Sequence, residues 1–178
     1  MIALLLPAAY VLLGAGWLIM KTEGELQRHA VRWAKTAWAP VVLGMGLISL
    51  ATPLVSATVR AKWFSMPEII ALLPIPLFTL LALVGVRAIL NSHRVLGKVC
   101  WLPFVLTVAV FVFGAFGLAY SLYPYVVMDR VTIWQAASAT ESLAVIAIGC
   151  AFTVPAIVGY TIFSYRIFWG KARELHYA

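Results

Sequence analysis

The side chains that could bind a redox cofactor lie outside the apolar parts of this chain. Haem held between membrane helices takes histidine or methionine ligands from helix faces that point at one another. The three histidines are His29, His93 and His176, and all of them fall in polar stretches. Most methionines lie near the ends of apolar runs with no histidine close by, which favours packing over iron ligation. The residue types therefore exclude a bis-histidine haem across helices.

Proton or ion transport normally leaves ionisable side chains at membrane depth, and the apolar runs contain none. The acids closest to these runs are Glu23, Glu68, Asp129 and Glu141. Hydroxyl groups inside the runs leave two interpretations open, a polar track or hydrogen bonds to their own helix backbone. Cys100 and Cys150 show no metal-ligand spacing and are predicted to be free thiols. We therefore predict no catalytic, cofactor-binding or metal-binding residue, and no cofactor bound by this chain.

The apolar runs define the elements that surround these groups. The chain has 178 residues, of which 64% are hydrophobic and 11% are charged, and its mean hydropathy is +1.01. A soluble domain averages about 25% charged residues, so the solvent of this chain is lipid. The stretches without Asp, Glu, Lys or Arg are residues 1–20, 36–59, 69–86, 99–128 and 142–165. Each is close to the ~20 residues that cross a bilayer as a helix.

Continuous apolar runs, rather than alternating ones, exclude a β-barrel. We predict an all-α integral membrane protein with about five transmembrane helices in one transmembrane domain, residues 1–178. The helices are expected at about residues 2–21, 37–57, 67–90, 100–122 and 140–165. Pro74 and Pro76 should kink or unwind the third helix, and Pro155 should interrupt the fifth. Gly14 and Gly16 leave space for close contact with a neighbouring helix.

The connection over residues 21–35 is predicted to lie along the membrane surface. Leu26, Ala30 and Trp33 fall on one face at helical spacing, which indicates a short amphipathic segment. The second membrane helix would follow it, with Pro40 in its first turn.

Basic residues are divided unevenly between the two sides of the membrane. The first loop holds four Lys or Arg, the third loop three and the tail three, whereas the two other loops hold two and one. The positive-inside rule then places the N-terminus in the periplasm and the C-terminus in the cytoplasm. Because the net charge of +7 lies in short loops, it indicates topology rather than nucleic-acid binding.

Five side chains near the run ends are candidate contacts with a partner subunit or with lipid. Trp17, Lys21 and Glu23 lie where the first apolar run meets the first charges. The alternative is a helix-end anchor, with the indole at the interface and the lysine reaching the headgroups. Trp134 and Arg166 are the other two candidates, and Arg166 also fits a simple basic flank.

Separate segments of the chain resemble one family of membrane proteins. Residues 13–24 (LGAGWLIMKTEG) are similar to the end of the fourth helix of subunit II of cytochrome bd-type quinol oxidases. Residues 121–127 and 131–138 resemble the last external loop of that family, and residues 160–171 resemble its final helix. The matches occur in the order of the family, and the resemblance covers nearly the whole chain.

The resemblance implies a subunit of a terminal oxidase in the inner membrane of a bacterium, which oxidises quinol and reduces dioxygen to water. In that family haem b, haem d and the quinol site belong to subunit I, and subunit II supports it without catalysing the reaction alone. The implied partners are subunit I, a small accessory single-helix subunit, membrane lipid and, through the complex, quinol. No nucleic acid is expected.

The chain is shorter than the family pattern. A family member carries about three further helices before Leu5, so the chain resembles the C-terminal part, in which the last four helices form one four-helix repeat. The acids of the first repeat on the proposed proton route have no counterpart. Two other hypotheses stay open. One is a small multi-helix transporter, which needs a polar cavity at mid-depth. The other is a stand-alone membrane scaffold or assembly protein.

Overall fold

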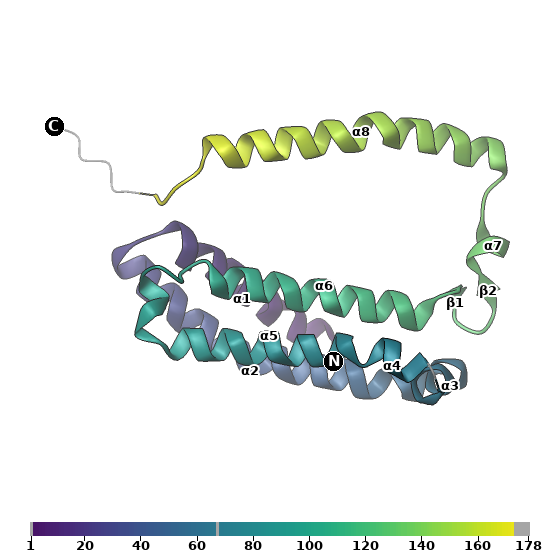
Figure 1. Cartoon of the computed structure of the whole chain (residues 1–178), viewed down its shortest axis with the longest axis horizontal. Coiled ribbons are helices and arrows are strands. Elements are labelled where there is room, and N and C mark those ends of the chain that lie inside the picture. The colour runs from purple at the N-terminus through teal and green to yellow at the C-terminus, as the bar shows by residue number, and fades with distance from the viewer. Residues whose placement is uncertain (1, 67, 173–178) are drawn as a thin grey trace. The chain divides into compact units, whose positions relative to one another are not determined.

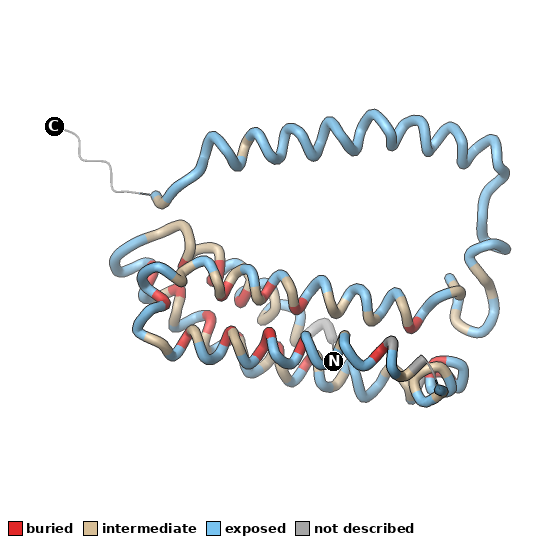
Figure 2. Tube along the Cα trace, viewed as in Figure 1, coloured by how far each residue is buried: buried red, intermediate tan, exposed pale blue. Residues whose placement is uncertain are grey.

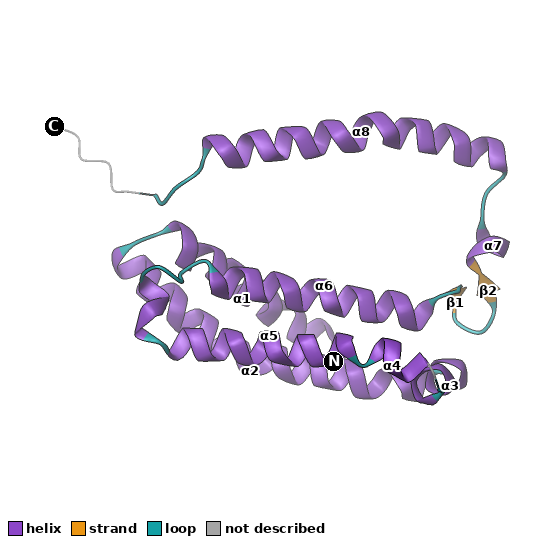
Figure 3. Cartoon of the chain, viewed as in Figure 1, coloured by secondary structure: helices purple, strands orange, loops and turns teal. Residues whose placement is uncertain are grey.

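The structure, a computed structural model, describes residues 2–66 and 68–172 and is 82% helical. Figure 3 shows the helices in purple and two short strands in orange. The chain divides into a first unit, Met1–Tyr123 with Lys171–Ala178, and a second unit, Pro124–Gly170. Each unit is described by itself below, and a single transmembrane domain stays a prediction.

The first unit is a bundle in which each long helix touches the next. Its helices are α1 (Ile2–Lys21), α2 (Gly24–Val55), α5 (Pro74–Asn91) and α6 (Leu102–Leu122). The closest pairs are α1 with α2 and α5 with α6, and contacts of α1 with α6 and α2 with α5 close the ring (Figure 1). Short elements connect these helices: α3 (Ala57–Phe64), α4 (Glu68–Leu72) and the 3-10 helix η1 (His93–Leu96).

Several described helices are long and apolar enough to cross a membrane. They are Gly24–Leu54, Pro74–Asn91, Leu102–Leu122 and Thr140–Ile167, with a shorter apolar helix at Leu5–Lys21. At a rise of about 1.5 Å per residue, even the 18 residues of α5 reach about 27 Å, close to the hydrocarbon thickness. The all-α membrane fold is confirmed, and the chain is a multi-pass membrane protein.

The second helix begins much earlier than the sequence analysis predicts. Residues 21–35 do not form a separate segment along the surface, because α2 starts at Gly24 and runs without a break to Val55. Pro40 consequently lies inside the helix rather than in its first turn. The buried face carries Ala30 and Ala34, both 0% exposed.

The three positions of the predicted amphipathic stripe differ in exposure. Leu26 and Trp33 are 45% and 47% exposed, so only Ala30 of the three predicted positions is buried. The small side chains of Ala30 and Ala34 let α2 pack closely against α1. That packing decides the conformation of a segment whose charges alone favour a loop.

Two contacts set the alignment of the antiparallel helices α1 and α2. The amide of Gln27 donates to the carbonyl of Ile19 at 2.8 Å, and a Cβ at Gly44 would lie 3.4 Å from Leu5. Between these points, Arg32 and Lys35 lie beside residues 11–17 of α1, in its uncharged part. Arg32 and Lys35 therefore lie about 6–15 Å from the level of Lys21 along the helix axis, in the direction of the middle of the bundle.

Proline acts differently at two of the predicted positions. The third predicted helix is broken between α4 and α5, where Pro74 has no amide hydrogen to donate. The bonds from Leu73 to Ile69 (2.9 Å) and from Leu77 to Leu73 (3.3 Å) continue around the break. In contrast, α8 (Thr140–Ile167) stays helical through Pro155, so the expected interruption there is not observed.

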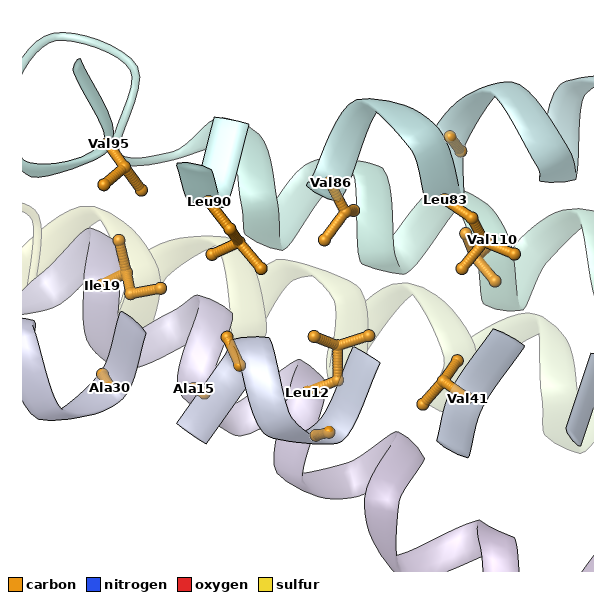
Figure 4. Close-up of a cluster of buried hydrophobic side chains, with 13 residues drawn as sticks. Leu12, Ala15, Ile19, Ala30, Val41, Leu83, Val86, Leu90, Val95 and Val110 are labelled. Carbon is orange, nitrogen blue, oxygen red and sulfur yellow. The ribbon is translucent and has the colours of Figure 1, made fainter. Parts of the chain in front are cut away.

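Buried residues of the first unit line the inner faces of its helices (Figure 2). Figure 4 shows Leu12 and Ile19 of α1, Val86 and Leu90 of α5 and Val110 of α6 in one cluster. In lipid, tail groups are as apolar as leucine, so van der Waals packing rather than water exclusion holds these faces together. Close fit between helices therefore has a large influence on stability.

Of the two glycines predicted for close packing, only one has a neighbour. A Cβ at Gly16 would lie 3.1 Å from the Cα of Phe104 and 3.2 Å from its backbone nitrogen. A Cβ at Gly14 would meet nothing within 4 Å. Gly16 is thus the position where α1 approaches the backbone of α6.

The second unit contains a hairpin that the sequence analysis did not predict. Its elements are β1 (Tyr125–Val127), β2 (Val131–Thr132), α7 (Ile133–Ala136) and α8. Asp129 adopts a positive φ of 58° in the turn, a conformation that aspartate tolerates better than most residues. Thr132 and Gln135 form a capping box at the start of α7. None of the described residues of α8 is buried.

Candidate functional site

The α1–α2 turn brings together three of the predicted contact residues. The Trp17 ring packs edge-on against Phe104, with 5.2 Å between ring centroids. The ammonium of Lys21 lies 5.4 Å from the centroid of the Trp17 ring. Glu23 and Lys171 form an ion pair with 3.6 Å between the charged atoms. Because the Glu23 side chain is exposed to solvent, this ion pair contributes about 0–1 kcal/mol to stability. The contact of these residues with a partner subunit or with lipid stays a prediction.

Hydrogen bonds satisfy the carbonyl groups at the end of α1. The last carbonyls of a helix have no partner within the helix. The Thr22 hydroxyl donates to Leu18 (2.7 Å), the amide of Gln27 donates to Ile19 (2.8 Å), and the backbone of Ala172 donates to Lys21 (2.7 Å). The turn is therefore a fixed part of the bundle rather than a loose loop.

Gln27 is the most buried of these three hydrogen-bond donors, at 4% exposure, and its substitution tests the turn directly. Replacing it by leucine keeps the volume but leaves the carbonyl of Ile19 without its donor. We expect a loss of about 1–3 kcal/mol in the free energy of unfolding, measured by circular dichroism in mixed micelles. Thr36→Val is the control, since that exposed hydroxyl bonds only within its own helix, to Arg32. An equal effect of both variants would contradict the role of Gln27.

At the opposite end of the bundle, Lys62 of α3 caps the C-terminal end of α6. Its ammonium donates to the carbonyls of Tyr120 (2.9 Å) and Tyr123 (2.8 Å). The same ammonium lies 4.5 Å and 5.5 Å from the centroids of the two tyrosine rings. A cation at the negative end of a helix dipole is favourable, so this arrangement ties α3 to α6. We call it the Lys62 clamp.

Trp63 extends the Lys62 clamp along α6. Its indole donates to the hydroxyl of Ser121 at 3.0 Å, and that hydroxyl donates to the carbonyl of Gly117 at 2.7 Å. Both polar groups are satisfied inside an apolar environment, where an unpaired group would be costly.

Trp38 links α2 to α5. Its indole donates to the carbonyl of Leu83 at 2.8 Å, and the guanidinium carbon of Arg87 lies 5.3 Å from the centroid of its ring. The ring is held by one contact on its edge and one on its face. This bond to α5 was not predicted from the sequence.

A cavity of about 240 Å³ lies between α2, α5 and α6. Its walls are mainly apolar, and they include Met45, Gly46 and Leu83. The Thr79 hydroxyl on its wall donates to Ile75 in its own helix at 2.8 Å, as the backbone-bonding interpretation of the hydroxyls expects. The cavity therefore suits hydrocarbon rather than a charged or strongly polar solute.

No group of three His, Cys, Asp or Glu lies close enough within the described ranges to hold a metal ion. His29 lies on α2 near Glu25 (3.9 Å) and against the edge of Trp33, and His93 lies in η1. His176 lies outside the described residues.

The structure places the two remaining predicted contact residues in the second unit. Trp134 is in α7 and is 64% exposed, and Arg166 is an exposed residue in the last turn of α8. They belong to different elements from the first three, and their roles stay predictions.

Sequence reasoning missed the polar groups that lock the bundle. Gln27 carried a signal, because it lies at helical spacing from Ala30 and Ala34. Lys62 is a lone cation in a short connection, and nothing local distinguishes it from Arg60, which is exposed. Its partners lie about 60 residues away in the chain.

The comparisons with known proteins agree with this architecture. No curated protein sequence matches the chain. The family model of cytochrome bd terminal oxidase subunit II matches residues 1–168 of the 178 residues. A match over this share of the chain, on a multi-pass helical protein, confirms the family that segments such as residues 13–24 suggested. The chain therefore belongs to the family of cytochrome bd terminal oxidase subunit II.

Proposed function

We propose that this chain acts as subunit II of a quinol oxidase, supporting a haem-bearing subunit I that oxidises quinol and reduces dioxygen to water. The family match over residues 1–168 carries the proposal. Membership of an oxidase family supplies the oxidoreductase context and a subunit I partner. The haems b and d and the quinol site would lie in that partner, as the resemblance to the family implies.

The same proposal includes the orientation and the location. The side with the α1–α2 turn and η1 would face the cytoplasm, because it carries most of the basic residues. The membrane would be the inner membrane of a bacterium. A small single-helix subunit and bound lipid would complete the complex.

The exposed apolar helices support a role inside a larger assembly. In the first unit, large apolar side chains are exposed on the long helices, for example Leu50 (70%) on α2 and Phe116 (62%) on α6. A membrane subunit buries such faces against lipid or against other subunits. The transporter alternative receives no support from the cavity between α2, α5 and α6, which is mainly apolar.

Affinity purification of the tagged chain from membranes in a mild detergent tests the proposal. We expect a larger haem-containing membrane protein to co-purify, and the fraction to consume dioxygen when quinol is added. A parallel preparation from cells without the tagged chain should lack both signals. Haem absorbance that stays with the isolated chain, or a purified chain without any haem-containing partner, would contradict the proposal. Substrate flux by the chain alone in liposomes would favour the transporter alternative.

A further inference from the structure

One exposed face of α2 carries cations at one end and uncharged residues along the rest. Arg28, Arg32 and Lys35 have the spacing i, i+4 and i+7, so they share this face. At the same spacing the face continues with Ala39, Leu43, Gly46 and Leu50. The order of the residues thus gives a basic end, near the α1–α2 turn, and an apolar remainder.

The neighbouring helix α5 also has a basic end and an apolar remainder, and its basic end lies on the same side of the bundle as that of α2. Arg87 lies near the end of α5 that meets η1, and its guanidinium covers the Trp38 ring of α2. Val84 and Leu80 follow on the same face of α5, and they are 55% and 56% exposed. Because α2 and α5 touch, the two basic ends lie beside each other around Trp38.

These cations have no carboxylate partner among the residues that the structure describes. The described ion pairs engage Glu23 with Lys171 and Glu25 with His29, so Arg32, Lys35 and Arg87 have none. Arg32 and Lys35 also lie beside the uncharged residues 11–17 of α1. Cations beside this uncharged part of α1 need an anion or water that they can contact, because burying an unpaired charge in hydrocarbon costs much free energy.

The apolar cavity begins about one turn beyond Trp38. Val42 and Gly46 of α2 and Leu80 and Leu83 of α5 line it on this side. Gly46 and Leu80 are exposed, so these two lining residues connect the cavity to the face that carries the cations at its other end. A Cβ at Gly46 would meet nothing within 4 Å, which shows that this position is open.

We propose that the α2–α5 groove, formed by Arg32, Lys35, Trp38, Gly46, Leu80 and Arg87, binds one anionic phospholipid from the leaflet next to the α1–α2 turn. Its phosphate lies between Lys35 and Arg87, and one acyl chain lies in the cavity. An acidic protein segment would match only the basic end, whereas a phospholipid matches the charged and apolar parts in their observed order. The inference does not depend on the oxidase function, because it uses only the described bundle and its membrane surroundings. If that side is cytoplasmic, the leaflet is the one richer in anionic lipid.

Native mass spectrometry of the purified, delipidated protein with the subunits it retains tests the site. The probes are phosphatidylglycerol and phosphatidylethanolamine with identical acyl chains. The variant Lys35→Gln/Arg87→Gln should bind phosphatidylglycerol about tenfold or more weakly, since each basic side chain near an anionic headgroup strengthens attraction about fivefold. Arg94→Gln/Lys98→Gln removes the same charge near the same end of the bundle, outside the groove, and should change the affinity less than twofold.

Gly46→Leu tests the apolar part of the groove independently. An added Cβ at this position meets nothing within 4 Å, so we expect the variant to keep the fold. The leucine side chain should displace the acyl chain, and both lipids should bind at least fivefold more weakly. Equal loss in both double variants, displacement of phosphatidylglycerol by inorganic phosphate, or unchanged binding in Gly46→Leu would each overturn the proposal. Loss of a protein subunit instead of lipid from Lys35→Gln/Arg87→Gln would show that an acidic protein partner occupies the groove.

Discussion

Gly16→Ala is expected to weaken the bundle, whereas Gly14→Ala, two residues away, is expected to stabilise it slightly. Both substitutions add the same methyl group to the same helix and gain the same helix propensity, up to about 1 kcal/mol. At Gly16 the new Cβ would lie 3.1 Å from the Cα of Phe104, a backbone atom that no side-chain rotation can move. At Gly14 the methyl group meets nothing within 4 Å. The difference between the two variants therefore isolates the close approach of α1 and α6.

We expect Gly16→Ala to unfold about 1–3 kcal/mol more easily than Gly14→Ala, the usual range for overpacking. Gly16→Leu should exceed this difference, because a larger side chain must push α6 away from α1. Unfolding of the purified protein in mixed micelles, followed by circular dichroism, measures the effect, and recovery of the assembled protein from membranes gives a second readout. If the two alanine variants were equally stable, α1 and α6 would not touch at this position.

Lys62→Met is the second substitution with a large expected effect. Methionine keeps the length and the apolar stem of lysine but removes the ammonium that donates to Tyr120 and Tyr123. Both carbonyls belong to the end of α6, where the helix itself offers no donor. Charge-assisted hydrogen bonds contribute about 1.5–3 kcal/mol each when buried. Here the bond to Tyr120 is partly buried and the bond to Tyr123 is exposed, so their contribution is smaller. We expect a loss of about 2–4 kcal/mol, including the contacts with the two rings.

Arg60→Met provides the matched control for the Lys62 clamp. It removes the same charge two residues earlier in α3, from an exposed side chain, and should change the free energy of unfolding by less than about 0.5 kcal/mol. Lys62→Arg keeps the charge but changes the geometry of the donors, so an intermediate loss is expected. A similar loss for Lys62→Met and Arg60→Met would mean that charge in α3, and not the contact with α6, determines stability.

Composition and local pattern sufficed for the class of this protein. Uncharged runs about as long as a bilayer is thick predict membrane helices, because lipid offers the backbone no other hydrogen-bond partner. The break before Pro74 was also predictable, since proline lacks the amide hydrogen at its own position. The family followed from short segments such as residues 13–24.

Local pattern failed where distant contacts override it. The charges of residues 24–36 favour a surface loop, yet the alanine face of that segment packs against α1 and makes it the start of α2. The strands around Asp129 are too short to show a period of two, so the hairpin had no sequence signal.

Hydropathy, run length and motif order identify a helical membrane subunit of the oxidase family, because all three can be read locally along the chain. The contacts that hold the bundle together, and the place where it would bind a ligand, depend instead on the three-dimensional arrangement of the helices. The bond from Trp38 joins residues 45 positions apart, and those from Lys62 join residues 58 and 61 apart. Such pairs are set by the distance between helix axes and by helix rotation, which no local pattern encodes.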